Sequence, residues 1–239
     1  VSLFPEAHEK RLEESIPCVL GKDHRISGVY DLSGRLAGRG TSEGLLRSMG
    51  GSFTLSAREG RIQSDHVVKG VIAYLNSTSL LKGSHDDLLR EGVPYERILF
   101  RGSLRESALT LSEAVIKGRD LNLAAEGTIG LRDGALAMNV LAAPFTRLDR
   151  LLGKVPLVKY LVGNALIVIP ARVEGTFERP VVKPLATAAV GRNVTNLMKN
   201  LVEVPMKVIE PVLPEELERK AATPAPENNK GAAPDGAAP

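Results

Sequence analysis

The sequence predicts an α+β protein built on a twisted, antiparallel β-sheet with one apolar face, short helices on one side and a C-terminal helix. Three observations support this prediction. Apolar and polar residues alternate with a period of two through much of 25–143, and turn residues separate the alternating segments. Helical spacing of apolar residues is confined to short stretches and to the region after Pro184. One-sided alternation is typical of antiparallel strands that bury one face.

The first group of strands lies in residues 27–64. Residues 27–40 predict a strand with Tyr30, Leu32 and Leu36 on one face. Residues 51–64 predict a strand, a turn at residues 58–60 (Arg-Glu-Gly) and a second strand, because a charged pair followed by glycine is a common turn signal.

Short helices separate the strand groups. Residues 43–49 predict one helix, closed by two glycines. A second helix carries apolar residues between Val67 and Leu75, with Ser64 or Asp65 as its N-cap. A third begins at Ser84.

The segment from Tyr95 to Ala143 predicts a meander of four strands. Turn signals divide it at 105–107, 117–120 and 132–134. One parity of these strands collects most of the large apolar side chains. We take them as candidates for the lining of an apolar groove that binds lipid: Ile98, Phe100, Leu109, Leu111, Leu121, Leu123, Ile129, Leu131, Leu136, Met138 and Val140. Periodicity does not distinguish an open groove from a face covered by helices.

Residues 165–185, ALIVIPARVEGTFERPVVKPL, begin as a strand but contain Pro170, Pro180 and Pro184. Proline has no N–H to donate, so it is tolerated mainly on edge strands. We therefore predict that the strand through Pro170 is the last, edge strand of the sheet and is unpaired on at least one side at that residue. A turn around residues 177–179 then leads to a brief returning strand.

The segment from Pro184 to Leu213 predicts a helix, kinked or restarted at Pro205 and Pro211. Its apolar stripe fits packing on the protein's own sheet, and docking on a partner or a membrane surface is the alternative. The stripe contains Val190, Val194, Leu197, Met198, Leu201 and Val202. Residues 221–239, rich in alanine and proline, predict disorder.

These boundaries divide the chain into four parts. They are an incoming N-terminal segment (1–24), a β-rich domain (25–184), an amphipathic helical segment (185–213) and an Ala/Pro-rich tail (214–239). The sequence begins with Val1, which suggests a fragment or a processed chain.

Composition argues against several classes of function. Aromatic residues make up 4% of the chain and there is no tryptophan, which disfavours proteins that bind ligands by stacking. The net charge of +3 comes from interspersed charges, so we expect no nucleic-acid partner. The single cysteine, Cys18, excludes an internal disulfide. No window of 18 uninterrupted apolar residues predicts a membrane span.

A search for chemistry leads us to expect a protein that is not an enzyme and has no metal or cofactor. No histidine has a zinc-ligand spacing, and the motif Gly-x-Ser-x-Gly is absent. Residues 85–87 (His-Asp-Asp) fit a helix start better than a carboxylate site. The glycine-rich stretch 38–44 lacks the ending of a phosphate-binding loop, and a helix N-cap at Thr41 or Ser42 explains it better.

The order of these segments resembles the C-terminal region of AsmA-like proteins of the Gram-negative envelope. The resemblance is carried by SGVYDLSGRLAGRGTSEGLLRSMGGSFTLSAREGRIQ, then the meander, then LLGKVPLVKYLVGNALIVIPARVEGTFERPVVKPL. It covers Arg25 to Leu185, about two thirds of the chain. The closing signature corresponds here to Val155-Pro156, Gly163, Ile169-Pro170, Val173, Gly175-Thr176, Pro180 and Val182. Among these we take Gly163, Pro170, Gly175 and Pro180 as structural motif residues.

The resemblance implies a periplasmic module of a longer parent protein that an N-terminal helix anchors in the inner membrane. It implies phospholipid transport between inner and outer membrane, or outer-membrane biogenesis, through an apolar β-sheet groove. The partners it implies are phospholipid and other envelope proteins. The alternative is a structural or assembly-factor module that binds an outer-membrane protein or another envelope partner through a sheet edge or the C-terminal helix.

Overall fold

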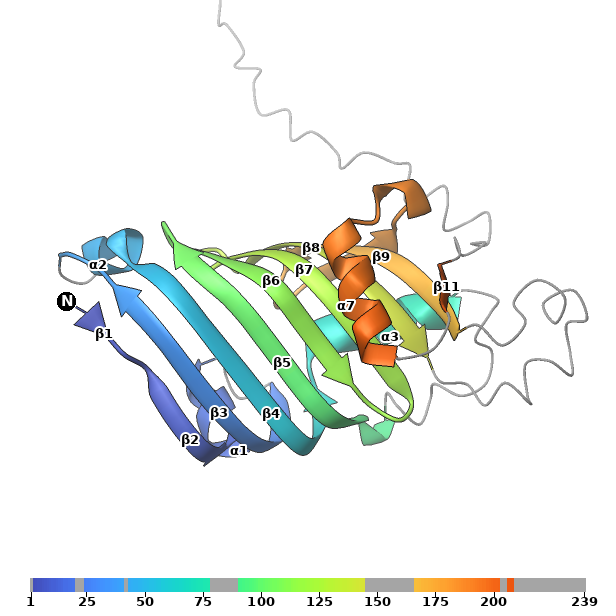
Figure 1. Ribbon diagram of the computed structural model, residues 1–239, viewed down its shortest axis with the longest axis horizontal. Helices are drawn as coiled ribbons and strands as arrows, with labels where there is room; N and C mark the ends of the chain where they lie inside the picture. Colours follow the sequence, from blue (N-terminus) through green and yellow to red (C-terminus); the bar gives the residue numbers. More distant parts are fainter. Residues whose placement is uncertain are drawn as a thin grey trace, which may run out of the picture.

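The computed structural model describes residues 2–19, 24–40, 43–77, 90–144, 166–202 and 206–208. Ten antiparallel strands form one open sheet in the order β1-β3-β4-β5-β6-β7-β8-β9-β10, with β2 also on β3, and β11 runs parallel to β9 (Figure 1). The predicted fold class, an antiparallel sheet with helices, is therefore confirmed. The strands are β1 (Ser2–Leu3), β2 (Glu6–Arg11), β3 (Arg25–Ala37), β4 (Gly50–Ser64), β5 (Val93–Arg105), β6 (Ala108–Lys117), β7 (Leu121–Gly130), β8 (Ala135–Pro144), β9 (Leu166–Thr176), β10 (Pro180–Pro184) and β11 (Met206–Val208). The helices are α1 (Leu12–Val19), α2 (Glu43–Ser48), α3 (His66–Ser77), a 3₁₀ turn (Thr187–Ala189) and α7 (Arg192–Val202).

The predicted four-strand meander is confirmed as β5 to β8, paired in sequence order. Its turns use the residues that the sequence indicates. Glu106 and Ser107 adopt positive φ values of 51° and 63° in the β5–β6 turn. In the β7–β8 turn, the Asp133 carboxylate accepts a hydrogen bond from the Ala135 N–H at 3.0 Å.

The predicted turn at residues 58–60 is wrong, because β4 runs without a break through this point. Glu59 has a φ of +53°, and the register with β3 shifts between the pairs Ser27–Arg61 and Val29–Arg58. The charged pair and glycine thus form a β-bulge within one long strand. A Cβ on Gly60 would overlap the carbonyl oxygen of Ser27 on the paired strand β3, so only glycine fits at this point of the bulge.

Two apolar clusters lie on the two faces of the sheet. The inner face packs against α1 and α3, and the cluster there joins residues from β4 to β9. The outer face packs against α7 through Leu99, Val115, Ala124 and Leu141. Figure 1 shows α7 in front of the sheet and α3 behind it. The predicted packing of the C-terminal helix on its own sheet is confirmed, since Val194 and Met198 are completely buried.

The C-terminal helix is shorter than predicted. It spans Arg192–Val202 rather than most of 184–213, and residues 206–208 form a strand. This strand, β11, pairs with β9 in parallel, from Met206 opposite Leu166 to Val208 opposite Val168. The predicted helix at Ser84, Gly163 and the predicted disordered tail lie outside the described residues.

The prediction for Pro170 is right in one part and wrong in another. The strand that contains it, β9, is not the last of the sheet, because β10 pairs beyond it. The pairing with β10 stops at Ala171–Pro184, so within the described residues no β10 residue lies opposite Pro170. Pro170 therefore pairs with Leu141 of β8 on one side and costs no hydrogen bond to β10 on the other.

Candidate functional site

The inner face carries an apolar surface that crosses the sheet from strand to strand. Residues directly opposite one another on neighbouring strands share a face. Leu32 of β3, Leu55 of β4 and Phe100 of β5 are opposite one another in this way, and Phe53 lies in the next row of the same face. The row continues through Ala114 and Ala125 to Val140 and Ala171. The face is thus apolar from β3 to β9.

The structure brings ten of the eleven predicted lining residues together on this face. Eight of them belong to the buried core: Ile98, Leu111, Leu121, Leu123, Ile129, Leu136, Met138 and Val140. Phe100 and Leu109 are only partly buried. Most of the predicted lining is therefore core that the protein covers itself.

Leu131 does not line the face, which corrects the prediction. β7 ends at Gly130, and the Leu131 N–H donates to the Ser107 carbonyl at 2.9 Å in the turn beyond it. The side chain is 42% exposed. Parity counted along a strand has no meaning once the strand has turned.

Several of the partly buried side chains of the inner face lie together toward one end of it, on β4, β5 and β6. Besides Phe100 and Leu109, they include Phe53 and Leu55 of β4, which the sequence-based set of lining residues omitted. Their signal was available, because they alternate with Ser52, Thr54 and Ser56. The prediction of two short strands in place of one long β4 left these two residues out of the set.

Helices close the other end of the inner face. Ser15 of α1 is hydrogen-bonded to the Tyr30 hydroxyl at 2.9 Å. From α3, the side chains of Val71, Ile72 and Leu75 are almost completely buried in the inner cluster. The inner face therefore has a closed half under α1 and α3 and a partly open half, whose lining we define as Leu32, Leu36, Phe53, Leu55, Phe100 and Leu109.

The start of α3 is fixed by Asp65. One carboxylate oxygen accepts from the Val68 N–H at 2.9 Å, and the other lies 3.2 Å from Nδ1 of His24. The cap that the sequence offered at Ser64 or Asp65 is thus Asp65. His24 is 5% exposed, and its ring meets that of His66 edge-on at 5.5 Å. These groups position a helix, and none of them lines either of the two pockets described next.

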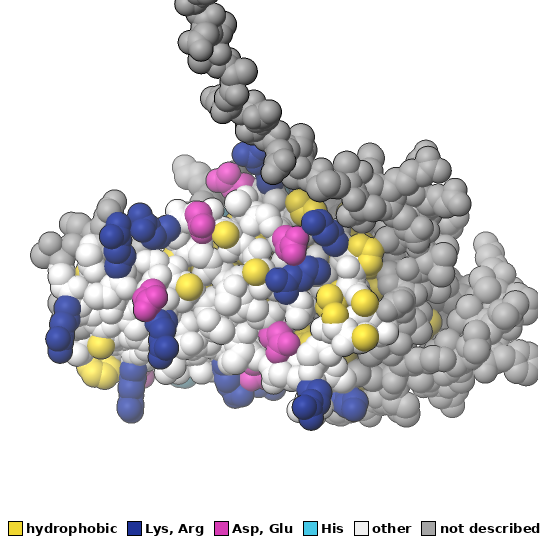
Figure 2. All heavy atoms as spheres, turned by 90° about the horizontal axis from the view of Figure 1, so that it is seen from above, with side chains coloured by type: hydrophobic (Ala, Val, Ile, Leu, Met, Phe, Trp, Pro, Cys, Tyr) yellow, Lys and Arg dark blue, Asp and Glu magenta, His cyan; other side chains and the backbone are white. Residues whose placement is uncertain are grey.

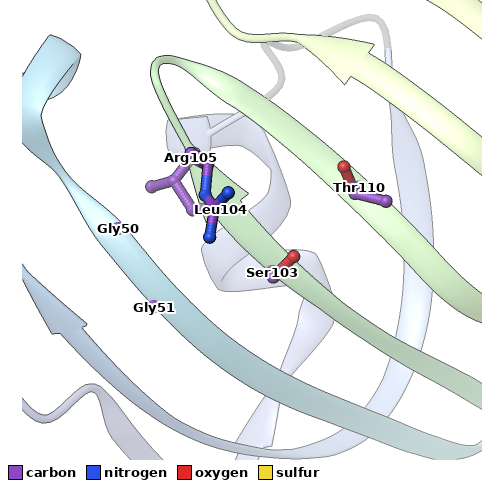
Figure 3. A pocket seen from close by; sticks show the side chains of 6 residues that line it. All are labelled: Gly50, Gly51, Ser103, Leu104, Arg105 and Thr110. Carbon is purple, nitrogen blue, oxygen red and sulfur yellow. The ribbon is translucent and has the colours of Figure 1, made fainter.

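A pocket of about 540 Å³ lies next to the partly open half, at the same end of the sheet. Figure 3 shows its lining: Gly50, Gly51, Ser103, Leu104, Arg105 and Thr110. Register places Arg35, Ser52, Ser103 and Thr110 in one row across β3 to β6 on the outer face. The lining thus combines a guanidinium, two hydroxyls, glycine main chain and one leucine, with no carboxylate among its residues. Such groups donate hydrogen bonds and suit an anion.

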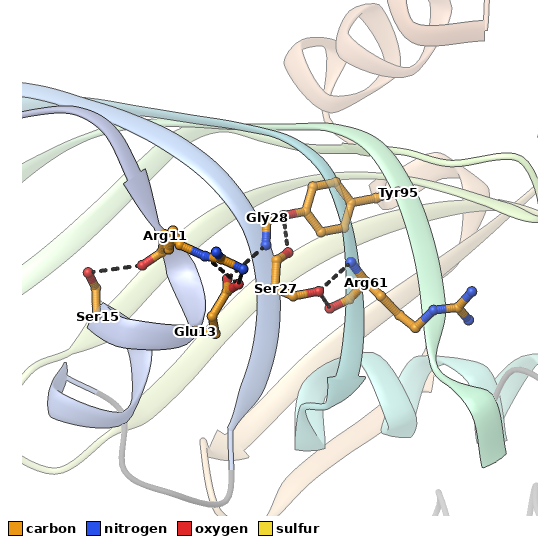
Figure 4. A network of polar contacts seen from close by, with 7 residues as sticks. All are labelled: Arg11, Glu13, Ser15, Ser27, Gly28, Arg61 and Tyr95. Carbon is orange, nitrogen blue, oxygen red and sulfur yellow. Dashed lines mark hydrogen bonds and ion pairs between the residues drawn. The ribbon is translucent and has the colours of Figure 1, made fainter.

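A second pocket, of about 530 Å³, lies at the opposite end beside the β4 bulge. Two of its polar side chains, Tyr95 and Arg61, have structural partners, and Figure 4 shows the bond that Tyr95 makes. The Tyr95 hydroxyl donates to the Ser27 carbonyl at 2.6 Å, and burial raises the pKa of Tyr95 to about 12. The Arg61 guanidinium donates to the carbonyls of Glu91 and Gly92, both at 3.1 Å. Tyr95 and Arg61 are therefore part of the framework that holds β3, β4 and β5 together.

The structure places three of the four family-motif residues in the β9–β10 hairpin. Gly175 has a φ of +87°, and a Cβ there would lie 2.5 Å from the carbonyl oxygen of Arg179. Pro180 begins β10 opposite Gly175. The third is Pro170 of β9, and the fourth, Gly163, is outside the described residues. All three act on backbone shape and none offers a reactive group.

Among the described residues, no group of three or more His, Cys, Asp or Glu side chains is arranged to hold a metal ion. The helices that the structure describes include none with the length and apolar character needed to cross a membrane. Comparisons with protein-family models, curated proteins and solved structures found no match to this chain.

Proposed function

We propose that this chain is a non-enzymatic lipid-handling module whose inner sheet face holds part of a phospholipid acyl chain. The observation that carries the proposal is the partly open half of the inner face. Its side chains continue the buried core without a polar interruption, yet remain partly accessible. An acyl chain placed there would extend the core of the protein.

The energetics of such binding are simple. Burial of one methylene group stabilises by about 0.8 kcal/mol, so a chain segment of several methylenes gains enough to offset the cost of its immobilisation. The surface needed is aliphatic and needs no specific polar contact. Leu32, Leu55 and Phe100 present such a surface across three adjacent strands.

The resemblance to AsmA-like proteins supports the cellular setting of this proposal. We place the module in the periplasm, as part of a longer protein held in the inner membrane by a segment outside this sequence. Its task there is a contribution to phospholipid transport between the inner and outer membranes, or to outer-membrane biogenesis.

The test is lipid binding by protein purified without detergent. Native mass spectrometry and solvent extraction detect a co-purified phospholipid, and a fluorescent phospholipid measures uptake. We expect Leu55→Gln with Phe100→Gln to weaken uptake about tenfold, since each substitution removes part of an apolar contact worth on the order of 1 kcal/mol. Val181→Gln is the matched control, because Val181 is a 47% exposed apolar residue on β10. Absence of both bound lipid and uptake in the wild-type protein would overturn the proposal.

The alternative function, an assembly factor that recruits an envelope protein, gains less support. One version used the apolar stripe of α7, but that stripe is buried against the sheet. The other version used a sheet edge. Edge strand β10 begins and ends with proline, and β2 is charged and carries a register shift between Ala7 and Lys10. Both features discourage the addition of a further strand.

A further inference from the structure

One end of the sheet, which we call the rim, carries an excess of exposed arginines over exposed acidic residues. The rim consists of α2, the adjoining ends of β1, β3 and β4, and the β5–β6, β7–β8 and β9–β10 turns. Among the rim residues whose side chains the structure describes, exposed arginines outnumber exposed acidic residues. The arginines are Arg35, Arg39, Arg47, Arg105, Arg132 and Arg179, and the acidic residues are Glu106, Asp133 and Glu178. Figure 2 looks down on this end and shows dark blue side chains over the part near α2.

Ion pairs occupy only some of the described arginines. Arg58 pairs with Glu9 and Asp31, Arg101 with Glu113, and Arg172 with Glu174, whereas Arg97 and Arg119 near the opposite end of the sheet have no carboxylate partner among the described residues. Within the described residues, none of the six rim arginines is in an ion pair. The positive charge of the rim is therefore available to an external anion.

Exposed apolar side chains lie at the same end. Four large apolar side chains are clearly exposed in the described residues. Two of them, Leu3 and Leu131, belong to the rim, and a third, Phe4, directly follows Leu3. Phe4 is 71% exposed, directly after the short strand that pairs Leu3 with Leu36. An exposed phenylalanine beside arginines is costly in water but suits the boundary between lipid head groups and acyl chains.

The pocket lined by Ser103, Arg105 and Thr110 opens at the rim. Its lining offers one guanidinium group and two hydroxyls, and Arg35 and Ser52 lie in the same row of the outer face beside it. Charge-assisted hydrogen bonds from such donors are the usual protein ligands of phosphate oxygens. The partly open half of the inner face begins next to this pocket, on the other side of the same strands, at Leu109 and Phe53.

We infer that the rim docks on an anionic phospholipid bilayer, with its arginines on head-group phosphates and Phe4 and Leu131 at the interface. This inference rests on the proposed function for its choice of a lipid partner. Each basic residue near an anionic membrane surface contributes about 1 kcal/mol, so several together give reversible attachment. Docking in this orientation places the open half of the inner face beside the bilayer from which a lipid would enter.

The experiment is co-flotation of the whole chain with vesicles. Phosphatidylcholine vesicles containing phosphatidylglycerol are compared with pure phosphatidylcholine vesicles at low and raised salt. We expect binding to the anionic vesicles only, weakened by salt. Arg35→Gln with Arg105→Gln should weaken it about fivefold per arginine, and Phe4→Ser with Leu131→Ser should weaken it as well. Arg97→Gln with Arg119→Gln is the matched control, because it removes the same charge from the opposite end.

The outcomes separate this inference from the proposed function. Equal binding to both kinds of vesicle, or equal losses in the rim variant and its control, would overturn docking through the rim. Displacement by inorganic phosphate beyond the effect of matched chloride would also overturn it, in favour of a site for a single free anion. Uptake of fluorescent phospholipid from detergent micelles tests the inner face without a bilayer. A chain that takes up lipid but never floats would retain the proposed function and lose this inference.

Discussion

The hydroxyl of Tyr74 donates a hydrogen bond to the main-chain carbonyl of Pro170 over 3.4 Å. Tyr74 lies on α3 and Pro170 on β9, where β10 no longer pairs. The helix thus supplies a partner for a strand carbonyl that the neighbouring strand leaves free. α3 can lie this close because a Cβ on Gly70 would come within 3.2 Å of Val182 on β10. The hydrogen bond thus links α3, which covers the closed half of the inner face, to β9.

Substitution Tyr74→Phe tests this tie. Removal of the hydroxyl leaves the Pro170 carbonyl without its partner, so we expect a loss of about 1 kcal/mol in the free energy of unfolding. Urea denaturation measures the change. Ser77→Ala on the same helix is a control for helix propensity, since the Ser77 hydroxyl donates to the Tyr74 carbonyl one turn away. A stability equal to wild type would show that the Pro170 carbonyl has another partner.

Alkaline pH should weaken the fold through two tyrosines. Burial raises the pKa of both Tyr74 and Tyr95 from 10.0 to about 12. Their contribution is fully present below the unfolded-state pKa of 10.0. It is lost as pH rises toward 12, because the unfolded chain releases its protons first. Each tyrosine adds a slope of at most about 1.4 kcal/mol per pH unit in this window.

Urea midpoints measured from about pH 8 to about pH 11 show this loss. The double variant Tyr74→Phe with Tyr95→Phe should have a lower midpoint at neutral pH and a flatter dependence above pH 10.0, because the groups that titrate are gone. Identical slopes in the wild type and the variant would contradict the assignment to these tyrosines.

Asp65 should be important for the position of α3. Asp65→Ala removes both the N-cap acceptor for Val68 and the partner of the buried His24, so we expect a loss of about 2 kcal/mol. Asp65→Asn keeps an oxygen for the cap and should lose less. Hydrogen exchange of the α3 amides, together with urea denaturation, measures both effects. Equal losses in the two variants would show that the cap contributes nothing.

Met198 tests the packing of α7 on the outer face. It is completely buried together with Val194, so Met198→Ala should cost about 2–5 kcal/mol through lost burial and a residual cavity. Lys199→Ala, at an exposed neighbouring position, should change stability by less than about 0.5 kcal/mol. A neutral Met198→Ala would mean that the helix leaves the sheet in solution.

Local patterns in the sequence were enough to predict much of the sheet. The meander from β5 to β8 could be predicted because each strand alternates and each turn carries glycine or charged residues at the reversal. Helix α3 could be located from its apolar spacing and from Asp65, and α7 from the stripe through Val194 and Met198. These features depend on neighbours within a few residues along the chain.

Only the tertiary structure decided the features that depend on pairing between distant segments. β4 passes through residues 58–60 because β3 and β5 pair with it on both sides, and a bulge then costs less than a turn. Leu131 leaves the inner face because β7 pairs with β6 only as far as Gly130. The division of the inner face into closed and open halves depends on where α1 and α3 cross it, and the rim gathers arginines from turns far apart in the chain. The sequence by itself therefore determined which segments are strands and which side of each is apolar, because both follow from local periodicity. The strand register and the positions of α1 and α3 decided which part of that apolar side remains accessible, because the burial of a side chain depends on what packs against it.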